Sequence, residues 1–415
     1  MSFSSLGLSE PLVRAVAARN YGPPTPIQAA AIPAILRGGD VRASARTGSG
    51  KTAAFALPIL QLLAEARQKN RAPARRPRAL VLAPTRELVA QIGESFRAYG
   101  RHLPELLKIA VVFGGVSINP QMMALRGGAD LVVATPGRLL DLVAHNALSL
   151  SEISILVLDE ADRMLDLGFA QELAGILALL PPQRQSLLFS ATFPPAVQGL
   201  EEELLREPTR IDIPVTDIAI PAIDQRVIEV DQARRTQLLR HLIEAEGWTR
   251  VLVFVATKYR TEHVAQKLRQ GGIDAGAFHG ELSQGARTAA LTAFKAGTLR
   301  VLIATDVAAR GIDIAALPAV VNYDLPRSAT DYLHRIGRTG RAGESGVAVS
   351  FVSAETHAHF LLMEKRHRLQ LTREQIPGFE PVEITVPPAP ATGGIKGRRP
   401  SKKDRLRAAA ARKSG

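Results

Sequence analysis

The chain contains no cysteine, and its 415 residues also lack two kinds of apolar segment. Without cysteine there are no disulfides, no thiol nucleophile and no Cys-ligated zinc, which fits a reducing compartment. No stretch approaches about 18 uncharged apolar residues, so we expect no membrane span. Met1–Ser5 lacks a basic segment followed by an apolar one. We therefore expect no secretory signal and a cytoplasmic location.

Length and composition predict a globular protein with two domains. Apolar residues make up 46% of the chain. The net charge of +13 is unevenly distributed, because residues 396–415 hold nine Lys or Arg against one Asp. Such a basic tail suggests a polyanionic partner, with nucleic acid the first choice; the alternative is a tail that only increases solubility.

One apolar run ends in a cluster of carboxylates. Residues 153–162 read Ile-Ser-Ile-Leu-Val-Leu-Asp-Glu-Ala-Asp, which predicts a buried parallel strand that ends on Asp159. Strand ends of open parallel sheets line the ligand crevice, where a cation would relieve the repulsion between carboxylates. Asp159 would then hold Mg²⁺ and Glu160 would orient the attacking water. Taken alone, the stretch also fits an acidic turn that begins a helix.

A phosphate-binding loop upstream decides between these interpretations. Residues 45–52 fit the P-loop pattern except that Ala45 replaces the first glycine. Its backbone N–H groups would surround phosphate oxygens, Lys51 would reach the β- and γ-phosphates, and the Thr52 hydroxyl would bind Mg²⁺. Its members are Ala45, Arg46, Thr47, Gly48, Ser49, Gly50, Lys51 and Thr52.

Strands alternate with helices along most of the chain, which predicts parallel sheets covered on both faces. A proline-containing segment at 206–222 interrupts the alternation, and no P-loop follows it. The second half is therefore a second α/β domain and not a second ATPase. We expect strands near 41–45, 79–83, 109–113, 130–134, 153–158, 186–190, 210–213, 225–230, 251–255, 275–278, 300–304, 319–323 and 347–352.

Polar turns follow many of these strands, and all of them would meet at the carboxyl edges of the sheets. Several such turns in series suggest an extended track for a polyanion. Near the end of the second domain, residues 334–341 carry three arginines at a spacing of three, which would lie on one face of a helical turn. Arg338 and Arg341 would be arginine fingers on the phosphates of the first domain.

The proline-rich segment Tyr21–Gln28 would hold the Gln28 amide in place to read an adenine edge, and Phe3 would stack on the base.

Taken together, these motifs resemble those of DEAD-box ATP-dependent RNA helicases, over roughly residues 1–355. Asp159–Asp162 is similar to the motif that names the family. The short core and basic tail resemble the bacterial RhlE-type branch. Asn20 departs from the family pattern, which usually has glycine there, and Arg42 and Ser44 are unusual before the P-loop. Other matches, in family order, are Pro84–Leu88, Thr135–Arg138, Ser190–Thr192, Ala304–Asp306, Arg310–Asp313 and His334–Arg341.

The resemblance implies an α/β fold with two RecA-like parallel-sheet domains, a short linker and a disordered basic C-terminal tail. The boundaries would be 1–212 (with a Q motif at 1–29), 213–222, 223–372 and 373–415. ATP and Mg²⁺ would be the cofactors. The nucleotide site would comprise Phe3, Tyr21, Gln28, residues 45–52 and Asp313, with Mg²⁺ held by Thr52 and Asp159 and catalysis by Lys51, Glu160, His334, Arg338 and Arg341.

By the same resemblance, Asp162, Ser190 and Thr192 would couple the ATP site to RNA. The enzyme would be a monomer that binds RNA through its backbone, independently of sequence, and locally separates short duplexes. An ATP-dependent RNA clamp and a DNA translocase are the alternatives. The RNA contacts would be Arg86, Gly115, Thr135, Gly137, Arg138, Thr257, His279, Gly280, Arg287 and Thr305.

Overall fold

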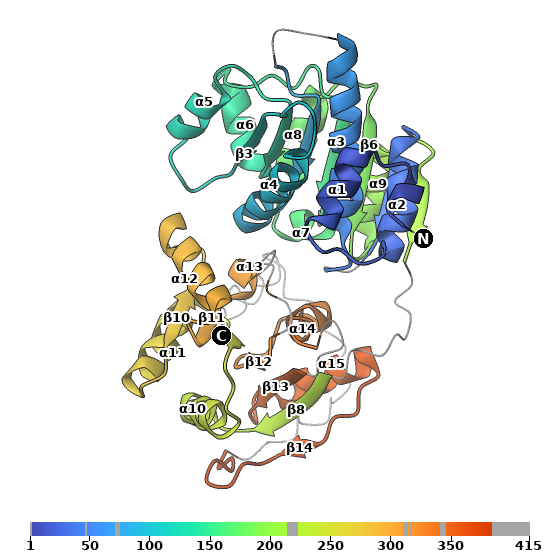
Figure 1. The fold of residues 1–415 in the computed structure, drawn as a ribbon. Coiled ribbons are helices and arrows are strands. Elements are labelled where there is room, and N and C mark those ends of the chain that lie inside the picture. Colours follow the sequence, from blue (N-terminus) through green and yellow to red (C-terminus); the bar gives the residue numbers. More distant parts are fainter. Residues whose placement is uncertain are drawn as a thin grey trace, which may run out of the picture.

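Two units, each built on a seven-stranded parallel sheet, make up the chain (Figure 1). The computed structural model describes residues 2–45, 48–70, 75–213, 223–309, 314, 317–340 and 346–383. The first unit runs from blue to green in Figure 1 and the second from yellow-green to red. Among the described residues, no helix is both long and apolar enough to cross a membrane.

The first sheet has the strand order β3-β4-β2-β5-β6-β1-β7. Its central strands are fully buried because apolar residues fill both of their faces. Its strands are β1 (Val41–Ser44), β2 (Ala79–Leu82), β3 (Ile109–Val112), β4 (Leu131–Ala134), β5 (Ile155–Asp159), β6 (Gln185–Ser190) and β7 (Thr209–Asp212).

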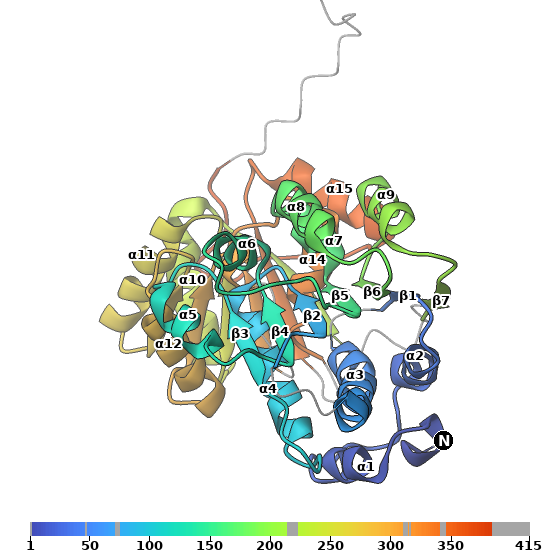
Figure 2. The same cartoon turned by 90° about the horizontal axis from the view of Figure 1, so that it is seen from above.

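Helices cover both faces of this sheet, with α1–α4 on one side and α6–α9 on the other (Figure 2). Each face has its own apolar core. The helical segments are η1 (Ser4–Leu6), α1 (Glu10–Ala17), α2 (Pro26–Leu36), α3 (Lys51–Asn70), α4 (Arg86–Gly100), α5 (Asn119–Leu125), α6 (Pro136–Ala144), α7 (Ala161–Asp166), α8 (Ala170–Leu179) and α9 (Pro195–Leu204).

The second sheet has the order β10-β11-β9-β12-β13-β8-β14 and is likewise packed on both faces. Its strands are β8 (Ile223–Glu229), β9 (Val251–Phe254), β10 (Ala275–Phe278), β11 (Val301–Ala304), β12 (Ala319–Asn322), β13 (Gly346–Val352) and β14 (Arg373–Glu374). Its helical segments are η2 (Gln232–Arg234), α10 (Arg235–Ala245), α11 (Lys258–Gln270), α12 (Gln284–Ala296), α13 (Asp306–Ala309), α14 (Ala329–Ile336) and α15 (His357–His367).

All thirteen strands expected from the sequence are confirmed, including β1, whose polar residues had interrupted the apolar pattern. Val41 and Ala43 are buried, whereas Arg42 and Ser44 lie on the half-buried side of the strand. Arg42 is tolerated there because it forms ion pairs with Glu201 and Asp212. The alternating pattern therefore reflects a strand with one polar face near the edge of the sheet.

The second unit extends past residue 372, where we had placed its end. Strand β14 pairs with β8, and Ile376 and Phe379 pack against the second core. The backbone N–H groups of Val382 and Glu383 donate to Asp231 at 2.9 and 3.2 Å. A Pro- and Gly-rich composition concealed these tertiary contacts. Residues 214–222 of the expected linker and 384–415 of the expected tail lie outside the described residues.

Candidate functional site

The loop between β1 and α3 has the backbone shape of a phosphate-binding loop. Gly48 and Gly50 have φ angles of +78° and +93°, which L-residues rarely adopt. A side chain at Gly50 would also come within 2.4 Å of the Gln28 amide nitrogen. The 20-residue helix α3 begins at Lys51, so its positive end lies at the loop. Arg46 and Thr47 lie outside the described residues.

Lys51 and Asp159 meet at the centre of the first unit but do not satisfy each other. Lys51 Nζ lies 3.9 Å from Asp159 Oδ1, and their side chains are only 6% and 3% exposed. Neither atom has a hydrogen-bond partner among the described residues. Buried charges without partners are costly, so the pair is arranged for a bound ligand. A phosphate for Lys51 and a cation for Asp159 would complete both.

Burial raises the pKa of Asp159 to about 6. The charge of Lys51 lowers this pKa, and the charge of Glu160 raises it further. A carboxylate that is this unfavourable in its free ionised form gains strongly from a divalent cation. The residues therefore fit the magnesium-nucleotide that the sequence predicts. Thr52, the other expected Mg²⁺ ligand, follows Lys51 in the first turn of α3.

Glu160 adopts a left-handed backbone conformation, with φ +55° and ψ +50°, which is unusual for a residue other than glycine. It turns the chain from β5 into α7. Its side chain is buried and accepts a hydrogen bond of 3.4 Å from Arg163. Strain of this kind is commonly retained where a side chain must be aimed at a reacting group.

Asp162, Ser190 and Thr192 form one hydrogen-bonded network. That they couple the ATP site to RNA stays a prediction. Asp162 Oδ2 accepts from both the backbone N–H (3.0 Å) and the hydroxyl (2.7 Å) of Thr192. Ser190 Oγ accepts from the Asp162 backbone N–H at 3.3 Å and donates to the Thr192 carbonyl at 2.7 Å. These hydrogen bonds join the acidic motif to the turn that follows β6.

The Q-motif residues support the phosphate loop. Gln28 Oε1 accepts from the Thr25 N–H at 3.0 Å, and its Nε2 donates to the Gly50 carbonyl at 3.2 Å. The Tyr21 hydroxyl bonds that of Tyr99 at 2.7 Å. Phe3 is buried, with its ring centroid 6.5 Å from that of Tyr21. That Gln28 reads adenine and Phe3 stacks on it stay predictions.

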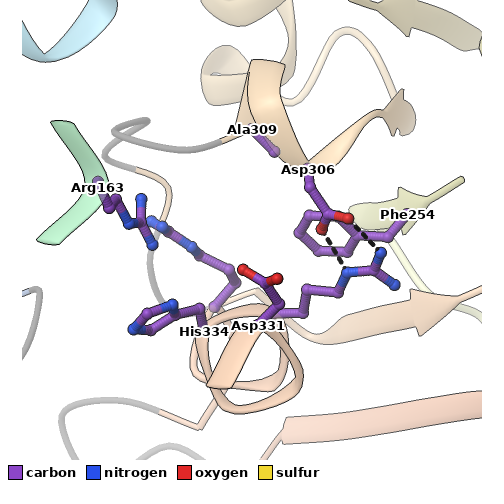
Figure 3. A pocket seen from close by; sticks show the side chains of 8 residues that line it. Arg163, Phe254, Asp306, Ala309, Asp331 and His334 are labelled. Carbon is purple, nitrogen blue, oxygen red and sulfur yellow. Dashed lines mark hydrogen bonds and ion pairs between the residues drawn. The ribbon is translucent and has the colours of Figure 1, made fainter. Parts of the chain in front are cut away.

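Basic residues of the second unit face the acidic motif across the cleft. Figure 3 shows Arg163 reaching from the first unit toward Asp331 and His334 of α14, and Arg338 also lines this pocket. Burial, followed by the nearby charge of Arg163, lowers the pKa of His334 to about 4. Its imidazole is therefore neutral at physiological pH and acts as a hydrogen-bonding group.

The helical turn expected to carry the arginines is shorter than the sequence predicts, because α14 ends at Ile336, before Arg338. Arg335 points into its own unit and donates to both Asp306 oxygens at 2.6 and 2.7 Å, shown as dashed lines from Asp306 in Figure 3. Arg338 follows the helix and lies in the cleft. Arg341 and Asp313, also expected at the nucleotide, lie outside the described residues.

The expected RNA residues of the first unit cluster after β2, β3 and β4. A side chain at Gly115 would come within 1.8 Å of the Arg86 guanidinium, so that arginine lies directly over the glycine. Arg138 donates to the Val116 carbonyl at 2.8 Å, and Thr135 accepts from the Gly114 N–H at 3.3 Å. Gly137 lies in the first turn of α6.

This cluster concentrates positive charge. Burial lowers the pKa of Arg86, and the neighbouring Arg287 and Arg138 lower it further. Glu87 opposes these effects and raises the pKa of Arg86. A polyanion would stabilise the charged Arg86 guanidinium at this partly buried site.

Arg287 joins the two units directly. It donates to Glu87 at 2.8 Å, with both side chains only 6% exposed, and to the His279 carbonyl at 3.0 Å. Thr257 caps α11 by accepting from the Arg260 N–H. Gly280 follows His279 in the turn after β10, and Thr305 follows β11. The expected RNA residues of both units thus lie at facing sheet edges, although Arg287 is engaged by a protein carboxylate.

Sequence reasoning missed Glu87, Arg163 and Asp306 as members of this region. Each lies within or beside a motif already singled out, at 84–88, 159–162 and 304–306. Their partners lie on other elements and so left no local signal. The only general signal is that a charged residue in a buried motif must be paired, which predicts a partner without identifying it.

The fold and this site define a two-domain P-loop nucleoside triphosphatase, with the phosphate loop in one domain and basic residues supplied by the other. The DEAD/DEAH box helicase model matches residues 25–200, and the helicase conserved C-terminal domain model matches residues 234–343.

Curated relatives agree with both models. The ATP-dependent RNA helicase DeaD of Mycobacterium tuberculosis is 42% identical over 381 residues, which cover 92% of this chain and 66% of that protein. The chain therefore spans slightly less than two thirds of the length of this relative. The DEAD-box ATP-dependent RNA helicase CshA of Bacillus cereus is 38% identical over 379 residues, covering 91% of this chain and 70% of that one.

Among solved structures, Saccharomyces cerevisiae Dbp5 bound to RNA and ADP BeF3 matches with a TM-score of 0.78 and 33% identity, covering 90% of this chain and 95% of that one. A DEAD box protein from Methanococcus jannaschii matches with a TM-score of 0.51 and 37% identity, covering 90% and 99%. The chain belongs to the DEAD-box family of ATP-dependent RNA helicases. The RhlE-type branch stays a prediction.

Proposed function

We propose that this chain is an RNA-stimulated ATPase that binds RNA through its backbone and locally separates short duplexes. The observation that carries the proposal is the buried, mutually unsatisfied Lys51–Asp159 pair. His334 and Arg338 of the other unit line a pocket with Arg163, which follows the acidic motif. Relatives named as ATP-dependent RNA helicases, and a neighbour solved with RNA and ADP BeF3, support ATP and RNA as the two ligands.

In the first unit, Lys51 binds the β- and γ-phosphates, while the glycines of the loop leave room for the phosphate oxygens. Asp159 and Thr52 would hold Mg²⁺, which would supply positive charge to neutralise the transferring phosphoryl group. Phe3, Tyr21 and Gln28 would hold the adenine base.

Glu160 orients the attacking water and accepts its proton, aimed by its left-handed backbone and by Arg163. The second unit contributes Arg338, and by family resemblance Arg341, to stabilise charge on the phosphoryl oxygens. His334 contacts the phosphoryl group as a neutral imidazole, and Asp313 contacts the ribose. Hydrolysis therefore requires the cleft to be closed.

RNA closes the cleft by bridging facing edges of the two sheets. Contacts to phosphate and 2′-OH groups make binding independent of base sequence. The Glu87–Arg287 pair joins the units beside this track. The Asp162–Thr192 network carries the closure to Glu160, because Asp162 lies two residues away on the same turn.

The remaining features of the proposal concern the whole molecule. We expect a cytoplasmic monomer whose basic residues 396–415 add RNA contacts. Deletion of residues 391–415 should weaken RNA binding and flatten its dependence on salt, because nine basic residues release several counterions. This deletion leaves β14 and the segment packed behind it intact. An unchanged salt slope would refute the tail as an RNA anchor.

The first test is steady-state ATP hydrolysis without nucleic acid, with single-stranded RNA and with DNA of the same sequence. We expect stimulation by RNA only; equal stimulation by DNA would favour a translocase. In assays of RNA retention and strand separation, Glu160→Gln should trap the closed RNA-bound state. Slow strand separation by this variant would show that closure of the cleft unwinds the duplex and that hydrolysis releases the enzyme for another cycle. RNA retention without any strand separation would instead indicate a clamp.

A further inference from the structure

An exposed aromatic pair lies on the first turns of α11, where no motif of the proposed function accounts for it. Tyr259 is 74% exposed. Its ring stacks on that of His263, with centroids 6.0 Å apart and planes inclined by 16°. The two residues are four positions apart, so they lie on one side of the helix.

This side of α11 is fixed to the turn that follows β10. Glu262, adjacent to the aromatic pair, bonds His279 at 3.0 Å, and Lys258 forms an ion pair with Glu281. Thr257 caps the helix where it leaves β9. The two rings are therefore presented on a rigid support at the carboxyl edge of the second sheet.

The polar groups around the rings favour a nucleic acid. His279 is about nine-tenths buried, and its Nδ1 has no hydrogen-bond partner among the described residues. Helix α11 carries four Lys or Arg and one Glu. Flat, exposed π-faces beside basic residues provide stacking sites for bases of any sequence, because every base has a π-face.

We propose that Tyr259 and His263 form a stacking platform for one base of single-stranded RNA at the point where the strand leaves Thr257 and His279. The inference rests on the proposed function, because it places this base next to the RNA track. The platform extends the footprint on the second unit and adds affinity through the base, whereas the other proposed contacts act through the backbone.

The test is fluorescence anisotropy of the full chain with single-stranded RNA in the presence of an ATP analogue. Tyr259→Ala should weaken binding by about five- to tenfold or more, as expected for loss of one base–aromatic stack. Tyr259→Phe, which keeps the ring, should bind as the wild type does. Leu362→Ala, which removes an equally exposed apolar side chain from α15, is the matched control.

RNAs that carry one abasic residue, moved along the strand, identify the mechanism. At one position the abasic residue should weaken binding to the wild type and have no effect on Tyr259→Ala. If Tyr259→Ala binds every strand as the wild type does, the platform is refuted and the stack only supports the helix. If the wild-type ATPase is not stimulated by RNA at all, the proposed function fails instead.

Discussion

The two units share one strand order, yet only the first leaves its central charge pair open. In the first, the strand at the sixth place is followed by Lys51 at the start of a helix, and the strand at the fourth place ends at Asp159 and is followed by Glu160. In the second, the corresponding positions hold Arg235 at the start of α10 and Asp324 just after β12.

The two charge pairs differ in whether the protein satisfies them. Arg235 donates to Asp324 at 3.0 Å and to Ser353 at 3.2 Å, and Asp324 also accepts from the Ala256 N–H at 2.8 Å. In the first unit, 3.9 Å separate Lys51 from Asp159. A buried charge pair with hydrogen bonds from the surrounding protein needs no ligand, whereas one left without them would gain from a bound ligand.

The largest effect should come from the residue that crosses between the units. Arg338→Ala should reduce kcat by about 10³-fold or more, as for other arginine fingers, while most of the ATP affinity remains. Nucleotide titration and steady-state hydrolysis at saturating RNA measure the two separately. Normal turnover would remove Arg338 from the reaction and confine the chemistry to the first unit.

Breaking the completed pair should cost stability. Arg235→Met removes one partner of the buried Asp324, which keeps Arg260 and the Ala256 N–H, so stability should fall by about 1.5–3 kcal/mol, the usual contribution of a hydrogen bond to a charged group. Urea unfolding of the second unit should show this loss. Exposed Arg240, which pairs with Glu244 on α10, provides the control, and Arg240→Met should change stability little.

Breaking the open pair should cost activity. Lys51→Met removes the proposed donor to the phosphates and should lower ATP hydrolysis by about 10²–10³-fold, the usual effect of losing one preorganised donor. Its stability without nucleotide should fall far less than that of Arg235→Met, since Lys51 Nζ forms no hydrogen bond with the described residues. Equal destabilisation of the two variants would contradict the distinction.

The smallest effect concerns pH. The pKa of His334 lies near 4 in the folded chain, below the usual 6.5, so the unfolded state binds more protons between these values. Stability should therefore fall as pH drops from about 6.5 to 4, by up to about 3 kcal/mol from this residue. His334→Gln should lose that part of the pH dependence in urea unfolding, whereas His145→Gln, at an exposed position, should retain it.

Local sequence patterns predicted most of the strands of both sheets. Apolar strands followed by polar turns gave the strand positions, and parallel sheets bring such turns to one edge. What the sequence could not give were partners far apart in the chain. Glu87 and Arg287 are 200 residues apart, and nothing near either residue indicates the other. By its spacing, Arg335 also fits the row of arginines expected on one helical face. In the structure it instead donates to Asp306 within its own unit.

Strand β14 has a practical consequence for shortened forms of the protein. A chain cut at residue 372 would uncover the edge of β8 at Val227 and Ile228 and the apolar surface beneath Ile376 and Phe379. An open, apolar sheet edge is a template for pairing between molecules. Preparations ending there should associate and precipitate, whereas those ending at residue 383 should stay dispersed.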